Sequence, residues 1–269
     1  MDGPRRGLGV LAEIERLEIG IGLESARHGM IVGRPARAVK EHSMRRRIAL
    51  LGFLAAFIPP AVRAAEPVDM LLVLAADVSR SVTEPKFKLQ REGAADAITH
   101  PDVVRAMTSG PNRRIAICFV EWATVGMQSV IVDWTVIASA ADAKNFGGRL
   151  VEVPRSFAGS TSISAAIDFA MAQLERAPFT SERRVIDVSG DGVNNSGRSV
   201  NAARDDAVRL GITINGLPII NDNPNPFPFG GGGFGGFGGF NVPPEGLAEY
   251  YRQNVIGGVG AFIMVAEDF

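Results

Sequence analysis

Hydroxyl and carboxylate side chains gather in three short segments whose spacing suits a metal ion. Residues 77–81 read DVSRS, which puts one carboxylate and two hydroxyls at alternate positions. Residues 159–162 read GSTS and residues 189–192 read SGDG, so they add another hydroxyl and a second carboxylate. Oxygen ligands of this kind suit a hard divalent cation, Mg²⁺ first, with Mn²⁺ or Ca²⁺ as alternatives. The candidate ligands are Asp77, Ser79, Ser81, Thr161 and Asp191.

Each of these segments also has a purely structural interpretation. An Asp or Ser after a strand often caps the next helix, and Asp-Gly is common in turns. A metal site is favoured because all three segments occur at the ends of elements that can share one edge of a sheet.

The amino-acid composition agrees with a site made only of oxygen ligands. The 269 residues include one cysteine and three histidines, which excludes an internal disulfide and any multi-cysteine metal site. The formal net charge of -1 argues against a broad basic face for nucleic acid. We expect Cys118, which lies inside an apolar run, to be an inert core residue.

Strand and helix patterns alternate along the chain after residue 65. We expect strands at 68–76, 114–122, 127–134, 184–189, 212–217 and 261–266, and helices at 86–98, 140–150, 162–176, 200–210 and 247–255. Continuous apolar runs joined by crossover helices predict a mainly parallel sheet covered on both faces. The short link after residue 122 predicts an antiparallel hairpin. Ligands of such sheets bind beyond the carboxyl ends of the strands, where the three polar segments fall.

Three further polar residues lie near these segments. Glu121 ends one expected strand, Asp187 precedes Asp191 by four residues, and Asn194 follows in the same loop. A carboxylate inside a buried strand must be paired or hydrogen-bonded, and Arg183 or its neighbour is the expected partner of Asp187. We expect all three as structural groups or second-layer supports of the site rather than as ligands.

The chain resembles a von Willebrand factor type A (vWA) domain over about residues 66–268, and it is most similar to a bacterial exported family labelled DUF1194. The segments that carry the resemblance are VDMLLVLAADVSRSV, FVEWA, PRSFAGSTSISAAIDFA, RRVIDVSGDGVNNSGR, GITINGLPI and YYRQNVIGGVGAF. It implies a doubly wound α/β fold with one antiparallel edge strand. It also implies that the five candidate ligands form a metal-ion-dependent adhesion site (MIDAS).

A site of this kind implies binding rather than catalysis, and no catalytic residue is assigned. A position left open on the cation would accept an acidic side chain from a partner protein. Two alternatives remain at this stage: a Mg²⁺-dependent hydrolase or phosphoryl-transfer enzyme, and a structural scaffold with an empty site. Arg80 departs from the small residue that related sequences have between the two serines, and it puts a cation beside the first loop.

The first 65 residues have the pattern of an export signal. Three arginines follow Met44, and an apolar run of 15 residues from Ile48 to Val62 comes next. A membrane-spanning helix needs about 20 apolar residues, whereas a signal peptide has this length and ends in small residues such as Ala64. We therefore expect a signal peptide at 44–64, with cleavage after Ala64, and export to the periplasm or beyond, with no stable membrane span after cleavage. Residues 1–43 are expected to be a gene-model extension or disordered.

The vWA-like domain is expected to cover residues 66–269. Within it, residues 221–244 are rich in proline and glycine and include GGGGFGGFGGF, a composition that cannot form a packed core. We expect a tolerated insertion, with the alternative that its phenylalanines hang over the metal loops. Because the chain stops at Phe269, just after the last expected strand, the closing helix of a vWA fold is expected to be missing.

Overall fold

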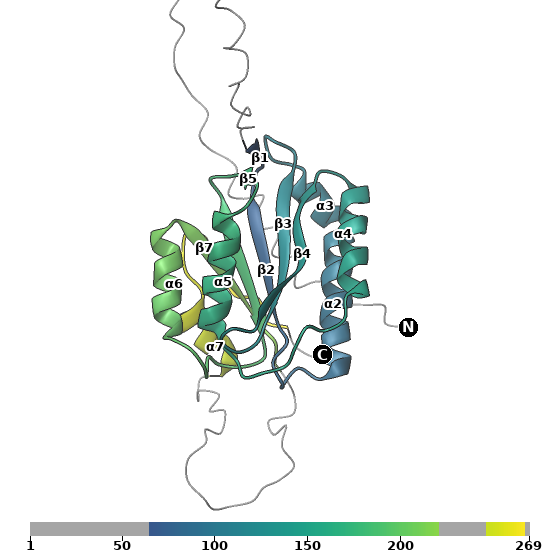
Figure 1. The fold of residues 1–269 in the computed structure, drawn as a ribbon. Coiled ribbons are helices and arrows are strands. Elements are labelled where there is room, and N and C mark those ends of the chain that lie inside the picture. The colour runs from purple at the N-terminus through teal and green to yellow at the C-terminus, as the bar shows by residue number, and fades with distance from the viewer. Residues whose placement is uncertain (1–64, 221–245, 267–269) are drawn as a thin grey trace, which may run out of the picture. The chain divides into compact units, whose positions relative to one another are not determined.

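The computed structural model describes residues 65–220 and 246–266 (Figure 1). Within these residues a five-stranded sheet has the order β4-β3-β2-β6-β7. Its parallel strands are β2 (Leu71–Asp77), β3 (Ile115–Trp122), β6 (Arg184–Gly190) and β7 (Ile212–Pro218), and β4 (Gln128–Ile137) runs antiparallel to β3 at one edge. The expected doubly wound, mainly parallel sheet with one antiparallel edge strand is confirmed.

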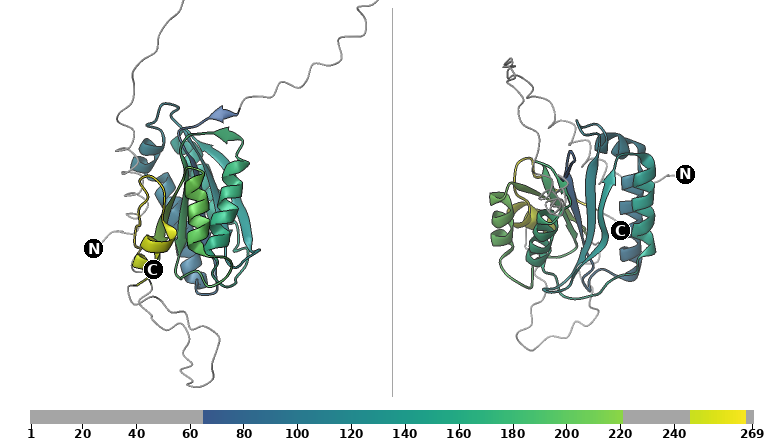
Figure 2. Two further views of the ribbon diagram at one scale, coloured as in Figure 1. Left: turned by 90° about the vertical axis from the view of Figure 1, so that its left-hand side faces the viewer. Right: turned by 45° about the horizontal axis from the view of Figure 1, so that its top comes forward.

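Helices cover both faces of the sheet (Figures 1 and 2). One face carries α2 (Glu84–Thr99), α3 (Pro101–Met107) and α4 (Ala140–Glu152). The other carries α5 (Ile163–Glu175), α6 (Val200–Arg209), α7 (Leu247–Tyr250) and the π-helix η1 (Tyr251–Val255). Each face has its own hydrophobic cluster. None of the helices in the described ranges has the length and apolar character to cross a bilayer.

The central strands form where the sequence has uninterrupted apolar runs. All eight residues of β3 are buried, and every residue of β2 except Leu74 is buried as well. The edge strand β4 is mostly half-buried because it has a neighbour on one side only. Burial on both sides of the sheet therefore fixes β2 and β3 at the centre of the domain.

Two local features differ from the sequence prediction. No helix is expected between residues 98 and 114, but Pro101 begins α3, whose first turn is capped by Nδ1 of His100, which accepts from the Asp102 amide at 3.3 Å. Proline fits this place because the first helical residue needs no amide donor. A two-stranded parallel sheet of β1 (Glu66–Pro67) and β5 (Phe179–Thr180) was not predicted, because strands of two residues leave no periodic pattern.

The C-terminal elements also differ from the prediction. The helix expected at 247–255 is one α-helical turn followed by a π-helix. The strand expected at 261–266 forms only isolated parallel bridges to β7, at Ile263 and Ala266. Pro218 explains the interruption, since it has no amide to donate where a continuous ladder would need one.

Several expectations concern residues that lie outside the described part of the chain. These are the N-terminal extension at 1–43, the signal peptide at 44–64 and the insertion at 221–244.

Candidate metal site

Two of the predicted ligands lie at the carboxyl edge of the sheet, on neighbouring strands. Asp77 is the last residue of β2, and Asp191 directly follows Gly190, the last residue of β6. The chain winds from β2 to β3 on one side and later returns to β6 on the other side of β2. Asp77 and Asp191 therefore lie at the point where the winding changes direction, which is the usual ligand position in open α/β sheets.

Four predicted ligands form one chain of hydrogen bonds. Asp77 Oδ1 accepts from the Ser79 amide at 2.7 Å, and the Ser79 and Ser81 hydroxyl oxygens are 3.0 Å apart. Ser81 Oγ then donates to Asp191 Oδ1 at 2.5 Å. The first site loop (residues 78–83) is thus joined through its hydroxyls to the third site loop (residues 191–199).

Thr161 lies in the second site loop (residues 153–162) and is 97% shielded from solvent, with 3% exposed. Its amide donates to Asn195 Oδ1 at 3.0 Å, and its carbonyl accepts from the Asn195 amide at 2.9 Å. A Cβ on Gly192 would lie 3.7 Å from Thr161 Oγ1. The fifth predicted ligand is therefore held against the loop that carries Asp191.

The Asp77 carboxyl is a buried titratable group of this edge whose pKa is strongly shifted. Its side chain is 0% exposed, and Oδ2 has no hydrogen-bond partner of ordinary geometry among the described residues. Burial, with the negative charge of Asp191 as the second cause, raises the pKa of Asp77 to about 7, although the Ser79 hydroxyl and nearby amides offset part of the rise. A buried carboxylate in this position is stabilised when a cation comes close to it.

The donor set fits a hard divalent cation. Hydrogen bonds join two carboxylates and two hydroxyls, Thr161 Oγ1 lies beside the loop that carries Asp191, and one carboxylate oxygen is both buried and unpaired. Within residues 65–220 and 246–266, no three His, Cys, Asp or Glu side chains cluster as a site for a softer metal would require. The chemistry of the site therefore favours Mg²⁺-like ions, with hydroxyl and carboxylate ligands.

Arg155 fixes the first site loop, and sequence reasoning missed it. Its guanidinium donates to the carbonyls of Ser79 at 2.6 Å, Val82 at 2.7 Å and Phe157 at 3.0 Å, and also to the carbonyl of Val78. One side chain from the second loop thus holds the turn that carries both serines. An arginine in a loop gives no periodic signal, and only its place in the segment PRSFAGSTS hinted at a role.

Glu121 does not reach the candidate ligands in this structure. It is 0% exposed, and its Oε1 pairs with Arg91 of α2, at 2.5 Å from Nη2 and 3.2 Å from Nε. Its Oε2 accepts from the Ser156 amide at 3.0 Å. Glu121 therefore supports the site indirectly, because it anchors the segment next to Arg155.

The other two second-layer candidates, Asp187 and Asn194, lie in different places, one in the sheet and one in the third site loop. Asp187 lies below the edge, where Oδ1 accepts from Asn215 on β7 at 2.8 Å. Burial lowers the pKa of Arg183, and the charge of Asp187 offsets part of that lowering. It supports the sheet rather than the loops. Asn194 lies in the third loop, where Oδ1 accepts from the Ser164 amide at 3.0 Å and thereby ties the loop to the start of α5.

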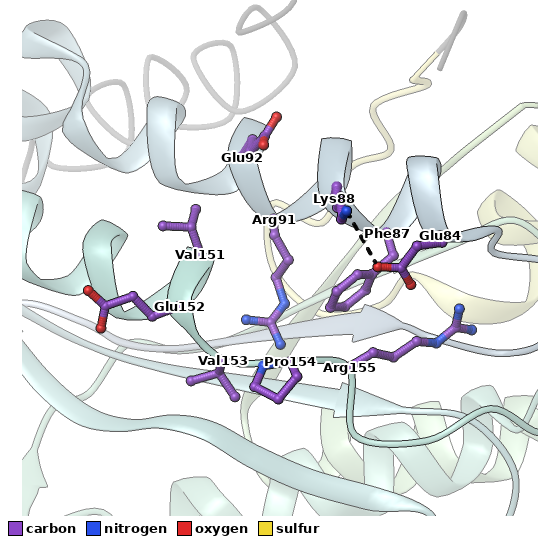
Figure 3. Close-up of a pocket in the computed structure, with 10 residues that line it drawn as sticks. All are labelled: Glu84, Phe87, Lys88, Arg91, Glu92, Val151, Glu152, Val153, Pro154 and Arg155. Carbon is purple, nitrogen blue, oxygen red and sulfur yellow. Dashed lines mark ion pairs between the residues drawn. The ribbon is translucent and has the colours of Figure 1, made fainter.

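A cavity of about 460 Å³ lies between α2 and the end of α4 (Figure 3). Arg91 and Arg155 line it, but each guanidinium is already bonded to protein oxygens, Arg91 to Glu121 and the Leu150 carbonyl. None of the five candidate ligands lines this cavity. It is a structural hollow behind the first site loop rather than the metal site.

The sheet order and the oxygen-bearing loops define a doubly wound α/β domain that resembles the vWA class. The chain belongs to the family described as "Protein of unknown function (DUF1194)", whose family model matches residues 67–269. No curated protein shows significant sequence similarity to the chain.

Solved structures with a similar fold come from several sources. Proximal thread matrix protein 1 from the mussel byssus is 17% identical with a TM-score of 0.49, and the match covers 74% of this chain and 42% of that one. A second structure of that protein, described as having a zinc-occupied MIDAS motif, is 17% identical with a TM-score of 0.47 and covers 75% and 43%. BatB from Bacteroides thetaiotaomicron is 18% identical with a TM-score of 0.44 and covers 74% and 91%. The chain thus spans less than half of the mussel protein.

Proposed function

We propose that this protein is an exported, divalent-cation-dependent binding module that holds the cation through Asp77, Ser79, Ser81, Thr161 and Asp191. The observation that carries the proposal is the buried, unpaired Oδ2 of Asp77 at the head of a hydroxyl chain that ends on Asp191. Two carboxylates near each other repel, and a divalent ion bound between them offsets that repulsion. When bound, the cation supplies an electrophilic point to which an acidic group of a partner is attracted.

The surface next to the site supports a protein partner. Val125 and Met127, in the turn between β3 and β4, are 57% and 39% exposed. A Cβ on Gly197 would lie 3.0 Å from Val125 Cγ2, and one on Gly159 would lie 3.3 Å from Met127 Sδ, so both side chains border the site loops. Methionine is enriched in protein–protein interfaces, and these two side chains would give a partner an apolar contact beside the charged site.

Arg80 adds a positive charge to this surface. Its side chain is exposed and forms no ion pair among the described residues, while its amide donates to the Gly159 carbonyl at 2.9 Å. A cation and an arginine beside two apolar side chains favour a partner segment that presents a carboxylate next to an apolar residue.

Metal binding is tested by thermal unfolding in EDTA and in excess Mg²⁺ or Mn²⁺. We expect the ions to raise the melting temperature of the wild type and to leave Asp77→Ala unchanged. Asp187→Asn is the matched control, because this carboxylate lies on the neighbouring strand but faces away from the loops. An equal shift in Asp77→Ala and wild type, or no shift in either, would refute the cation site.

Partner binding is tested by capture from an envelope fraction in Mg²⁺ and in EDTA. We expect a protein that is retained only with Mg²⁺ and is not retained by Asp77→Ala. Met127→Asp should weaken its binding, because it places a charge among the apolar side chains that border the site loops without changing a candidate ligand. Binding that persists in EDTA would contradict a cation-dependent contact. Export is tested separately by N-terminal sequencing of the mature protein, with Ala65 as the expected first residue.

A further inference from the structure

Tyr251 is a fully buried side chain whose hydroxyl lacks a partner. It is 0% exposed, and its OH forms no hydrogen bond with the described residues. Buried tyrosine hydroxyls are ordinarily hydrogen-bonded, because desolvating the hydroxyl without a partner is unfavourable. Packing alone would be served equally well by phenylalanine. The hydroxyl therefore calls for an explanation outside the hydrophobic core.

Two glycines let the Tyr251 ring cross the end of the sheet. A Cβ on Gly216 of β7 would lie 2.8 Å from Tyr251 Cδ1, and one on Gly190 of β6 would lie 2.7 Å from its OH. Both distances are too short for a real side chain, so these positions must be glycine where the ring lies. The ring thus extends from β7 across β6 towards β2, the strand that ends in Asp77.

The Tyr251 hydroxyl lies near Asp77 Oδ2, which is also a buried oxygen without a hydrogen-bond partner among the described residues. The same Cβ position on Gly190 lies 3.0 Å from Asp77 Oδ2, the oxygen without a partner. Two buried polar atoms, one a donor and one an acceptor, therefore flank a single point. The two atoms form no direct hydrogen bond, and one bridging water would satisfy both.

The backbone of the C-terminal segment explains how Tyr251 reaches this point. Residues 251–255 form a π-helix directly after α7, which lies at the same edge of the sheet as the site loops (Figure 1). Short π-helical segments are rare in proteins, and those that occur often lie at functional sites. The preceding residue, Tyr250, also points to this edge, where its OH accepts from the Asn194 amide at 3.2 Å.

We propose that Tyr251 is a positioning residue of the cation site, which donates from its hydroxyl to Asp77 Oδ2 through one buried water and so fixes the orientation of that carboxylate. This inference rests on the proposed function. It makes the segment 246–256 a part of the site, although that segment contributes no ligand.

The test is Tyr251→Phe, measured in two ways. In EDTA we expect the stability to urea to fall, because the proposed donor to the buried Asp77 Oδ2 is lost. By titration calorimetry with Mg²⁺ alone we expect the dissociation constant to increase about 10-fold or more, as is usual when a group that orients a metal ligand is lost. Tyr250→Phe is the matched control for the first measurement. It deletes the hydroxyl of the preceding residue, which accepts from the Asn194 amide, and its loss of stability in EDTA gives the cost of one bonded hydroxyl.

Hydrogen exchange gives an independent measurement on the wild type and Tyr251→Phe. We expect Mg²⁺ to increase the protection of amides 251–255 in the wild type and much less in the variant. An unchanged Mg²⁺ dissociation constant in Tyr251→Phe would overturn the inference while leaving the proposed function intact. A wild type that binds neither Mg²⁺ nor Mn²⁺ would overturn both.

Discussion

Replacing Asp77 by asparagine should stabilise the metal-free protein at alkaline pH, even though it removes a proposed ligand. The pKa of Asp77 is raised from 3.8 to about 7 by burial and by the charge of Asp191. A raised pKa means that the folded state binds the proton more tightly than the unfolded state does. The stability that this carboxyl contributes is therefore complete below about pH 4 and is lost as the pH rises through about 7.

The size of the effect follows from the shift. Three pKa units correspond to about 4 kcal/mol at 1.36 kcal/mol per unit, which is an upper bound because the asparagine amide must itself be accommodated. Its Oδ1 keeps the acceptor for the Ser79 amide, and its Nδ2 takes the place of the unpaired Oδ2 near the Tyr251 hydroxyl. We expect Asp77→Asn to exceed the wild type by about 2–4 kcal/mol at pH 8 and to match it near pH 4.

The assay is urea unfolding of both proteins in EDTA at pH 4, 6 and 8. The difference between the two proteins isolates Asp77, since the other titrating groups are common to both. Adding Mg²⁺ at pH 8 to 1,000 times its dissociation constant should remove this difference, because the ion then stabilises the wild type alone by about 4.1 kcal/mol. A difference that does not change with pH in EDTA would refute the electrostatic reasoning.

Four further outcomes test the surroundings of the site. Arg155→Ala should weaken Mg²⁺ binding at least 10-fold, measured by calorimetry, because the first site loop loses its donors, whereas the exposed Arg80→Ala should leave Mg²⁺ binding unchanged. Glu121→Gln should lower the free energy of unfolding by about 3–5 kcal/mol in urea, since it leaves the buried Arg91 charge uncompensated. Gly216→Ala should lower the melting temperature, because its methyl group would meet the Tyr251 ring at 2.8 Å. Cys118 should react with a thiol reagent only after unfolding, because burial raises its pKa to about 12; labelling of the native protein would contradict this.

The sequence predicted the fold well wherever burial imposes a period. Strand β3 and helix α5 were predicted to within one residue at each end, because a continuous apolar run and an amphipathic pattern each extend over several turns or pleats. The 261–266 segment was predicted wrongly as a strand. Its apolar pattern suits a strand, but whether a ladder continues depends on the partner, and Pro218 cannot donate to it.

For the candidate site, the sequence predicted which loops meet and missed what holds them. Asp77 and Asp191 are recognisable because they follow two buried strands whose ends share an edge. Arg155 and Tyr251 act through contacts that join distant parts of the chain, and neither has a local pattern. The position of Glu121 at a strand end predicted that it lies near the ligands. Its side chain instead points to the face of the sheet that α2 covers, where it pairs with Arg91.

The hydrogen bonds from Arg155 to the first site loop have a consequence for which substitutions this surface can accept. Arg155 bonds to carbonyl oxygens, which every amino acid provides, and the side chains at 78 and 82 are buried against Phe87, whereas the side chain at 80 is exposed. The exposed position among them, Arg80, is thereby free to vary without moving the serines. Partner preference can diverge at position 80 while the metal chemistry stays constant, which makes it the natural position to randomise when redirecting the domain to a new target.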